Sequence, residues 1–249
     1  MDVLGWVDRR GGIVRRDELA RAGFRRGELD RAGIQSVGRQ WLALDTAPPR
    51  LVEAATRRSR LACVSAADHH GLSLLRRPTI PHFWAPPGAR LPSGPPARMH
   101  RGRALLAPRP DQLVESLPDL LEHVAGCLPH VEALIVWESA IRQRLVTAGA
   151  LRQLAWRSPM ARTLAAEASS RSDSLLETIV TDSLRHLEMP FRQQVAILGH
   201  RVDILVGDRL VVQLEGFTVL RFTYEDVTQR LAHVLDMIRR AMVLHRVRR

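Results

Sequence analysis

Alternating apolar residues near the C-terminal end of the chain predict a β-hairpin. The β-rich runs Arg201–Val206 and Leu210–Gly216 flank Gly207-Asp208-Arg209, a Gly-containing loop of hairpin length. A two-residue turn would leave Gln213 among apolar side chains. A three-residue loop instead gives one apolar face, by pairing Val206 with Leu210, Ile204 with Val212 and Val202 with Leu214. Because a one-residue slip moves every side chain to the opposite face, the uniform face favours the three-residue loop.

The spacing of apolar residues over 2–44 predicts a small winged helix-turn-helix. Val3, Leu4 and Val7 recur at helical spacing in the first element. The predicted elements are a helix ending at Gly11-Gly12, a strand at Ile13-Val14, helices over Asp17–Ala22 and Arg25–Ala32, and strands over Ile34–Val37 and Trp41–Leu44. Two short helices joined at a glycine, here Gly23, are typical of a helix-turn-helix. The loop Gly38-Arg39-Gln40 suits the tip of a wing.

Helical periodicity dominates residues 48–168, between linkers predicted at Ala47-Pro48-Pro49 and Ala168–Asp173. A helical pair is expected at Leu51–Ala55 and Ala62–Leu75. The Pro-, Gly- and Arg-rich segment Pro78–Pro110 contains two short runs expected to form a small β hairpin, His82–Trp84 and Ala97–His100. Core positions are predicted at Leu113, Leu117, Leu120, Leu121, Val124, Leu134, Trp137, Ile141, Leu145, Leu151, Leu154 and Leu164.

The last part of the chain mixes helix and strand signals. Ser174 begins a helix that Pro190 is expected to end, and the strand Phe191–Leu198 follows. A last helix is predicted over Asp226–Leu244. The chain therefore reads as an α+β protein with three domains: a winged helix-turn-helix at 1–47, a mostly helical middle domain at 48–168, and an α/β domain at 169–249.

Charge narrows the class of partner. The formal net charge is +11, and all 37 basic residues are arginines. Such an excess favours an anionic partner, most simply nucleic acid. The alternative is a merely basic surface on a chain that uses Arg wherever other proteins use Lys.

Other sequence features indicate the cellular location of the protein and argue against particular metal sites. No apolar run reaches membrane-spanning length and the N-terminus has no signal pattern, so a cytoplasmic protein with no membrane partner is expected. Cys63 and Cys127 lie in apolar helical contexts without a CxxC spacing, and we expect buried thiols in a reducing compartment, not a disulfide or zinc site. His69 and His70 point about 100° apart on a helix and cannot chelate one ion together.

Arginines mark the candidate DNA contacts. Arg25 and Arg26 stand at the N-terminal end of the predicted second helix of the helix-turn-helix, which in this motif enters the major groove, and Arg31 lies on the same helix. Arg39 at the wing tip would reach the DNA backbone or minor groove. The alternative is a small protein-binding domain whose arginines form a solvated face.

Carboxylates mark a second candidate site. In the predicted hairpin Asp203 stands opposite Gln213, with Glu215 two residues further on. A carboxylate facing two acids, or an acid and a Lys, on the next strand is a Mg²⁺ layout for phosphodiester cleavage. Gln213 is a much weaker Mg²⁺ ligand. Glu177 has two interpretations, as the helix acid of such a site or as part of the capping box Ser174-x-x-Glu177.

The motifs also resemble known families. SDSLLETIV (Ser172–Val180), HRVDILVGDRLVVQLEG and TVLRFTYEDV resemble a C-terminal domain of actinobacterial proteins that is related to very-short-patch-repair endonucleases and PD-(D/E)xK nucleases. Residues 2–44 and the string SRLACVSAADHHGLSLL resemble AbiEi-type antitoxins. The resemblance implies a restriction-endonuclease-like fold at the C-terminus, repression of the protein's own promoter, and a cognate nucleotidyltransferase toxin as partner.

The chain departs from the nuclease family after Gly216. Family members carry a crossover helix there, with a His and an Arg-Asp pair, whereas Phe217-Thr218-Val219 follows directly here. Parallel neighbouring strands need a connection of about a dozen residues or more. We therefore expect a truncated, catalytically inactive domain in which Glu177, Asp203, Gln213 and Glu215 are vestigial, with no catalytic residue and no metal.

Three functions follow. The first is a DNA-binding regulator of antitoxin type that binds double-stranded DNA and needs no cofactor. The second, the main alternative, is a Mg²⁺-dependent endonuclease or nickase that uses Glu177, Asp203 and Glu215. Such a site would lack the basic or His group that helps water attack or protonates the leaving oxygen. The third is a scaffold whose basic surface binds a partner protein.

Overall fold

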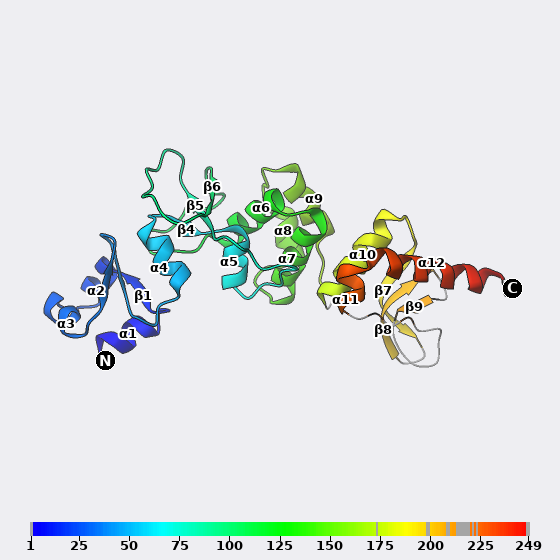
Figure 1. The fold of residues 1–249 in the computed structure, drawn as a ribbon, viewed down its shortest axis with the longest axis horizontal. Coiled ribbons are helices and arrows are strands. Elements are labelled where there is room, and N and C mark those ends of the chain that lie inside the picture. Colours follow the sequence, from blue (N-terminus) through cyan, green and yellow to red (C-terminus); the bar gives the residue numbers. More distant parts are fainter. Residues whose placement is uncertain are drawn as a thin grey trace. The chain divides into compact units, whose positions relative to one another are not determined.

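The computed structural model describes residues 2–172, 174–197, 200–207, 210–212, 220, 222 and 224–247. They form two compact units, Met1–Cys127 with Trp156–Ser158 and Leu128–Ala155 with Pro159–Arg249. Helices and small three-stranded sheets make the chain a mixed α+β protein, as expected (Figure 1). Every helix in this described part is too short or too polar to cross a membrane. The three-domain division at 1–47, 48–168 and 169–249 stays a prediction.

The first unit begins with the element order that the sequence predicts. The elements are α1 (Val3–Asp8), β1 (Ile13–Arg15), α2 (Arg16–Arg21), α3 (Arg26–Arg31), β2 (Gln35–Val37) and β3 (Trp41–Ala43). β3 lies between β1 and β2 and pairs antiparallel with both. Val7, Leu19 and Leu42 are buried in one core with Trp6. Leu4, expected on the apolar face of α1, is 42% exposed, and the buried side chains of that helix are those of Val3, Trp6 and Val7.

The second part of the first unit is organised around another small sheet. Its elements are α4 (Pro49–Thr56), β4 (Arg60–Leu61), α5 (Cys63–His69), β5 (His82–Ala85), β6 (Arg98–Arg101) and α6 (Leu117–Cys127). β5 pairs antiparallel with β4 and parallel with β6. The expected hairpin is therefore wrong: the connection from 86 to 97 is long enough for a crossover between parallel strands. The expected helix Ala62–Leu75 is also too long, because α5 ends before Gly71, whose φ is +66°.

One hydrophobic core joins the two sheets of the first unit. Ile13 and Trp41 come from the first sheet, Phe83 from the second, and Ala47 and Leu51 from the intervening segment. Ala47, expected in a linker, is only 6% exposed. The segment after β3 therefore packs against both sheets.

The second unit begins with helices and ends with a sheet and two more helices. Its elements are α7 (His130–Arg142), α8 (Ala148–Gln153), α9 (Pro159–Glu167), α10 (Leu175–His186), β7 (Phe191–Ile197), β8 (His200–Val206), β9 (Leu210–Val212), α11 (Tyr224–Gln229) and α12 (Leu231–Val247). Of the predicted core positions, Trp137, Leu151 and Leu164 are fully buried. Leu145 is 48% exposed, so its assignment to the core is wrong: it follows the end of α7, where the helical stripe stops.

The register predicted for this hairpin is confirmed in its described part. β8 and β9 pair antiparallel with Val206 opposite Leu210 and Ile204 opposite Val212. The predicted pair of Val202 with Leu214 lies outside the described residues. β8 is the central strand of the order β7-β8-β9, and both of its pairings are antiparallel.

Two helix boundaries differ from the prediction. α10 ends at His186, before Pro190, because Glu188 adopts a left-handed φ of +52°. The N–H of Glu188 donates to the Arg185 carbonyl and the N–H of Met189 to the Leu184 carbonyl, the Schellman arrangement that closes a helix C-terminus. The single helix expected over Asp226–Leu244 is two helices, interrupted at Arg230. The Arg230 carbonyl accepts the N–H groups of the first turn of α12.

Candidate functional site

The N-terminal end of α3 presents two of the predicted arginines. Arg25 precedes the helix, and its N–H donates to a Glu28 carboxylate oxygen at 2.6 Å. The Glu28 side chain is thereby held against the start of the helix, as the acidic residue of a capping box is. Arg25 and Arg26 are exposed, and neither side chain has a protein partner among the described residues. The Glu28 carboxylate is thus bound to the backbone, and the side chains of Arg25 and Arg26 are exposed.

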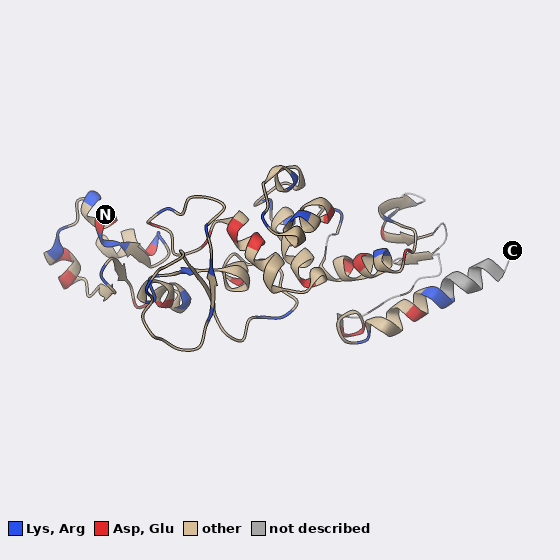
Figure 2. Cartoon of the chain, turned by 90° about the horizontal axis from the view of Figure 1, so that it is seen from above, with Lys and Arg blue, Asp and Glu red and all other residues tan. Residues whose placement is uncertain are grey.

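The opposite side of α3 anchors it to the core. Leu29 is 7% exposed and belongs to the core of the first sheet. Phe24, in the turn before α3, packs edge-on against Trp6 with ring centroids 5.7 Å apart. The turn itself begins at Gly23, which has a φ of +89°. Figure 2 shows that acidic and basic residues both occur on these N-terminal helices. The side chain of Arg31 lies outside the described part of the chain.

The loop from β2 to β3 carries Arg39 at an exposed position. Gly38 has a φ of +58°, which allows the tight turn between the two strands. Arg16, at the start of α2, donates to the Ser36 hydroxyl of β2 at 3.0 Å and ties the helices to this pair of strands. Arg39 therefore stands on the connecting turn of a strand pair that is tied to α2.

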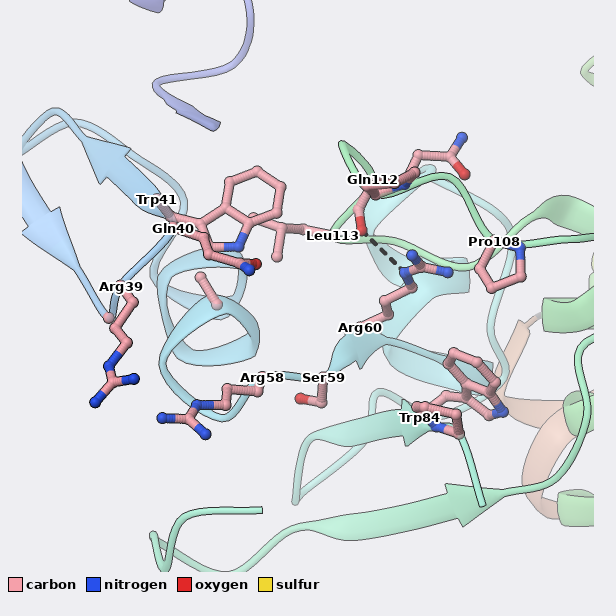
Figure 3. A pocket seen from close by; sticks show the side chains of 14 residues that line it. Arg39, Gln40, Trp41, Arg58, Ser59, Arg60, Trp84, Pro108, Gln112 and Leu113 are labelled. Carbon is pink, nitrogen blue, oxygen red and sulfur yellow. Dashed lines mark hydrogen bonds between the residues drawn. The ribbon is translucent and has the colours of Figure 1, made fainter. Parts of the chain in front are cut away.

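Arg39 also lines a cavity of about 450 Å³ within the first unit (Figure 3). Arg58, just after α4, and Arg60, on β4, line the same cavity, together with the indoles of Trp41 and Trp84. Figure 3 shows Arg39 and Arg58 on one side of the cavity and Arg60 beside Gln112 and Trp84. Sequence reasoning identified Arg39 and missed Arg58 and Arg60, because only the fold brings these segments together.

The three arginines of this cavity differ in how they are held. Arg60 donates to the carbonyls of Gln112 at 3.0 Å and Arg109 at 2.7 Å, and its guanidinium lies 5.7 Å from the Trp84 ring centroid. Burial lowers the pKa of Arg60, opposed by the charge of Glu115. The exposed side chains of Arg39 and Arg58 have no protein partner within the described ranges. A cavity with one fixed guanidinium near an indole ring and two further exposed arginines in its lining suits a phosphate with an adjoining flat ring.

The second unit brings two of the four nuclease-like residues together. Glu177 and Asp203 line one cavity of about 430 Å³, with an otherwise mostly apolar wall. Ser174 caps α10 by accepting the N–H of Glu177 at 3.2 Å, so this half of the predicted capping box is present. Gln213 and Glu215 lie outside the described residues.

Gln194 of β7 holds the Glu177 carboxylate from the sheet side. Its amide donates to Glu177 Oε2 at 3.2 Å, and its carbonyl accepts from Arg201 Nε at 2.6 Å. The φ of Gln194 is +54°, a left-handed value that few residues other than Gly adopt. The pocket therefore holds one carboxylate that is hydrogen-bonded to a neutral amide.

The first unit also contains a group of possible metal ligands that the sequence does not place together. We call it the Cys/His cluster. It consists of Cys63, His82, His100 and Cys127, and one donor atom of each lies within 4.8 Å of the others. The pKa of the Cys127 thiol is lowered because Cys63, and then the two imidazoles, hydrogen-bond its sulfur. Cys63 is buried, as expected, whereas Cys127 is half-buried. The two thiols lie close together, although they belong to different helices, α5 and α6.

Comparisons with known proteins find similarity among solved structures. No family model matches the chain, and no curated protein matches it. Among solved structures, the chain is similar to the Rv2827c protein from Mycobacterium tuberculosis, with 24% identity and a TM-score of 0.34, over 66% of this chain and 73% of that one. This similarity assigns the chain neither a family nor a function.

Proposed function

We propose that the chain is a DNA-binding regulator that contacts double-stranded DNA through residues 1–47, used as a winged helix-turn-helix. The observation that carries this proposal is the position of Arg25 and Arg26, exposed at the N-terminus of α3 while Leu29 anchors the other side of that helix in the core. In helix-turn-helix proteins, the N-terminal residues of the second helix contact base edges in the major groove.

The surroundings of α3 support this use. α2 and α3 meet at Gly23, and an antiparallel strand pair follows with Arg39 on its connecting turn. A guanidinium can bind guanine O6 and N7 in a bidentate manner or pair with phosphate. Because Glu28 binds the backbone N–H of Arg25, the arginine side chains are left available for such contacts.

The arginine-lined cavity of the first unit supports a second contact of a different kind. Arg39 and Arg58 have no protein partner in the described part of the chain, whereas Arg60 is already fixed by two carbonyls. Phosphate contacts position a protein on DNA but carry no base information. We assign sequence preference to Arg25 and Arg26, and affinity to Arg39 and Arg58.

In this proposal the C-terminal part, residues 169–249, is a catalytically inactive endonuclease-like domain. A neutral residue at 213 and the short connection after Gly216 support inactivity. A second candidate function is a Mg²⁺-dependent endonuclease, favoured by one observation: Glu177 and Asp203 share a cavity. The antitoxin role and its toxin partner rest on the sequence resemblance.

The DNA-binding proposal is tested by selecting preferred sequences from a random duplex pool. Wild-type protein is expected to enrich a defined sequence and to shift it in a gel. Arg25→Ala with Arg26→Ala should abolish the preference for that sequence over a scrambled duplex.

Arg76→Ala with Arg77→Ala provides the matched control. This pair is also adjacent and exposed, and it removes the same charge outside residues 1–47. It should leave the preference intact. An unchanged footprint in the Arg25 and Arg26 double variant, or a wild-type protein that shifts no duplex, overturns the proposal.

A further inference from the structure

The Cys/His cluster draws its donors from four different elements of the first unit. Cys63 begins α5, His82 begins β5, His100 lies in β6 and Cys127 ends α6. The two helices that carry the cysteines pack against each other. The cluster is therefore built by the tertiary fold of this unit, and no donor comes from the second unit.

The parallel pairing of β5 with β6 places the two imidazoles on one face. His100 is opposite Trp84, and His82 precedes Trp84 by two residues on the same strand. Residues two apart on a strand share a face, and diagonal neighbours across strands are within reach of long side chains. His82 Nδ1 and His100 Nε2 are 3.2 Å apart, and His82 Nδ1 and Cys127 Sγ are 3.8 Å apart.

These separations match the distances between ligand atoms around a tetrahedrally coordinated metal ion. With Zn–S bonds of about 2.3 Å and Zn–N bonds of about 2.0–2.1 Å, two nitrogens are about 3.3 Å apart, and a sulfur and a nitrogen about 3.5 Å apart. All four donors lie within 4.8 Å of one another, so small side-chain rotations bring them to bonding distance of a common point. We propose that the Cys/His cluster binds one Zn²⁺ ion in a closed, structural site.

The types of ligand atom in the cluster indicate which metal it would bind. Two sulfurs and two imidazole nitrogens in a tetrahedral arrangement are typical of zinc, whereas Mg²⁺ and Ca²⁺ require oxygen ligands. Four protein ligands leave no open position for water or substrate, and this distinguishes a structural zinc site from a catalytic one. The ion would cross-link α5, α6 and the parallel pair β5 and β6.

Neighbouring groups hold the cluster in place. The buried Glu115 carboxylate accepts the backbone N–H of Cys63 at 3.3 Å and pairs with His123 Nδ1 at 2.9 Å. The His123 ring lies beside His100 with centroids 4.7 Å apart. Outer groups of this kind orient ligands in metal sites. Cys63 has a left-handed φ of +51°, a conformation that persists only where the surroundings impose it.

The proposal is tested on the full chain without a histidine tag, kept reduced. Chelator-treated protein is supplied with Zn²⁺, desalted and assayed for metal by mass spectrometry. One zinc per chain is expected, and thermal unfolding should shift to higher temperature on zinc addition, because the assembled site binds the ion more tightly than the unfolded chain does. Co²⁺ in place of Zn²⁺ should give the absorption bands of tetrahedral thiolate coordination.

Variants assign the ligands. Cys127→Ser with His100→Asn should lose the bound zinc and the zinc-dependent thermal shift. His69→Asn is the matched control, since it removes an exposed imidazole from α5 outside the cluster, and it should keep one zinc per chain. The cobalt spectrum of the wild-type chain keeps the test decisive if the double variant does not fold. A wild-type protein that retains no zinc and gives no tetrahedral cobalt spectrum overturns the proposal, as does a double variant that retains one zinc per chain.

Discussion

The Gln194 amide donates a hydrogen bond to the Glu177 carboxylate at 3.2 Å, and Glu177 lines the same cavity as Asp203. In an active Mg²⁺ site the corresponding acid would bind the ion, directly or through water. Here the acid is held by a neutral amide whose own oxygen accepts from Arg201. The cavity thus combines two acids with a hydrogen-bonded chain, Arg201 to Gln194 to Glu177, that already engages one Glu177 oxygen.

We expect no metal-dependent cleavage from this cavity. Wild-type protein with Mg²⁺ or Mn²⁺ should nick supercoiled plasmid no faster than Asp203→Ala. Gln213→Glu should not create activity, because the chain runs directly from Gly216 to Phe217, without the crossover segment of the nucleases that its sequence resembles. Plasmid relaxation on a gel measures both. Nicking by the wild-type chain that Asp203→Ala abolishes would establish the endonuclease alternative.

The Ser174 cap predicts a modest stability effect. Ser174→Ala removes the oxygen that accepts the N–H of Glu177 and should reduce the free energy of unfolding of the second unit by about 1 kcal/mol. Urea denaturation followed by circular dichroism measures it. Ser183→Ala is the control on the same helix, since that hydroxyl donates to the carbonyl of Ile179 within the helix and does not cap its end. An equal loss in both variants would argue against a capping role.

The sequence predicts the local parts of this structure and misses the long-range ones. The pairing of Ile204 with Val212 follows from alternation and loop length, which act over a few residues. The parallel pairing of β5 with β6 depends on a long proline-rich connection that carries no periodic signal. α10 ends earlier than Pro190 predicts because Glu188 adopts a left-handed conformation that its residue type does not indicate.

The candidate sites divide in the same way. Arg25, Arg26 and Arg39 can be proposed from sequence because a short motif contains them. Arg58 joins Arg39 in one cavity only through the packing of the segment after β3 against both sheets. Likewise, the four members of the Cys/His cluster lie far apart in the chain, with no short metal-binding spacing, and only the fold brings them together.

Glu138 predicts a pH-dependent stability. It is 1% exposed on α7 and accepts the Thr178 hydroxyl at 2.6 Å. Burial raises the pKa of Glu138 above its ordinary value, although hydrogen bonds from Thr178 and Ser169 oppose the shift. The folded state then binds a proton more readily than the unfolded state. The free energy of unfolding should therefore fall as pH rises from the unfolded-state pKa through the higher folded-state pKa.

Glu138→Gln should make the free energy of unfolding depend less on pH. The fall that the variant loses is about 1.4 kcal/mol for each unit by which folding raises the pKa of Glu138. Urea denaturation at several pH values between about 4.5 and 7.5 measures the slope. Glu132→Gln, on the first turn of the same helix, is the matched control and should leave the slope unchanged. A slope identical in wild type and Glu138→Gln would show that Glu138 does not titrate in this range.

The arginine-lined cavity predicts a change in the salt dependence of DNA binding. Arg39 and Arg58 are exposed and line one cavity, where phosphate contacts would release counterions from DNA. Each lost phosphate contact reduces the slope of log affinity against log salt by about 0.9. Arg39→Ala with Arg58→Ala should therefore weaken binding equally on preferred and scrambled duplexes and make the slope shallower by about 2.

Fluorescence anisotropy across a salt series measures this slope on both duplexes. Arg76→Ala with Arg77→Ala controls for net charge, because it removes two positive charges elsewhere in the first unit. Its slope should stay close to that of wild type, since long-range attraction is screened over about 10 Å at moderate salt. An equal change in both double variants would mean that total charge, not contact at the cavity, sets the affinity. Selective loss on the preferred duplex would instead place Arg39 or Arg58 against bases.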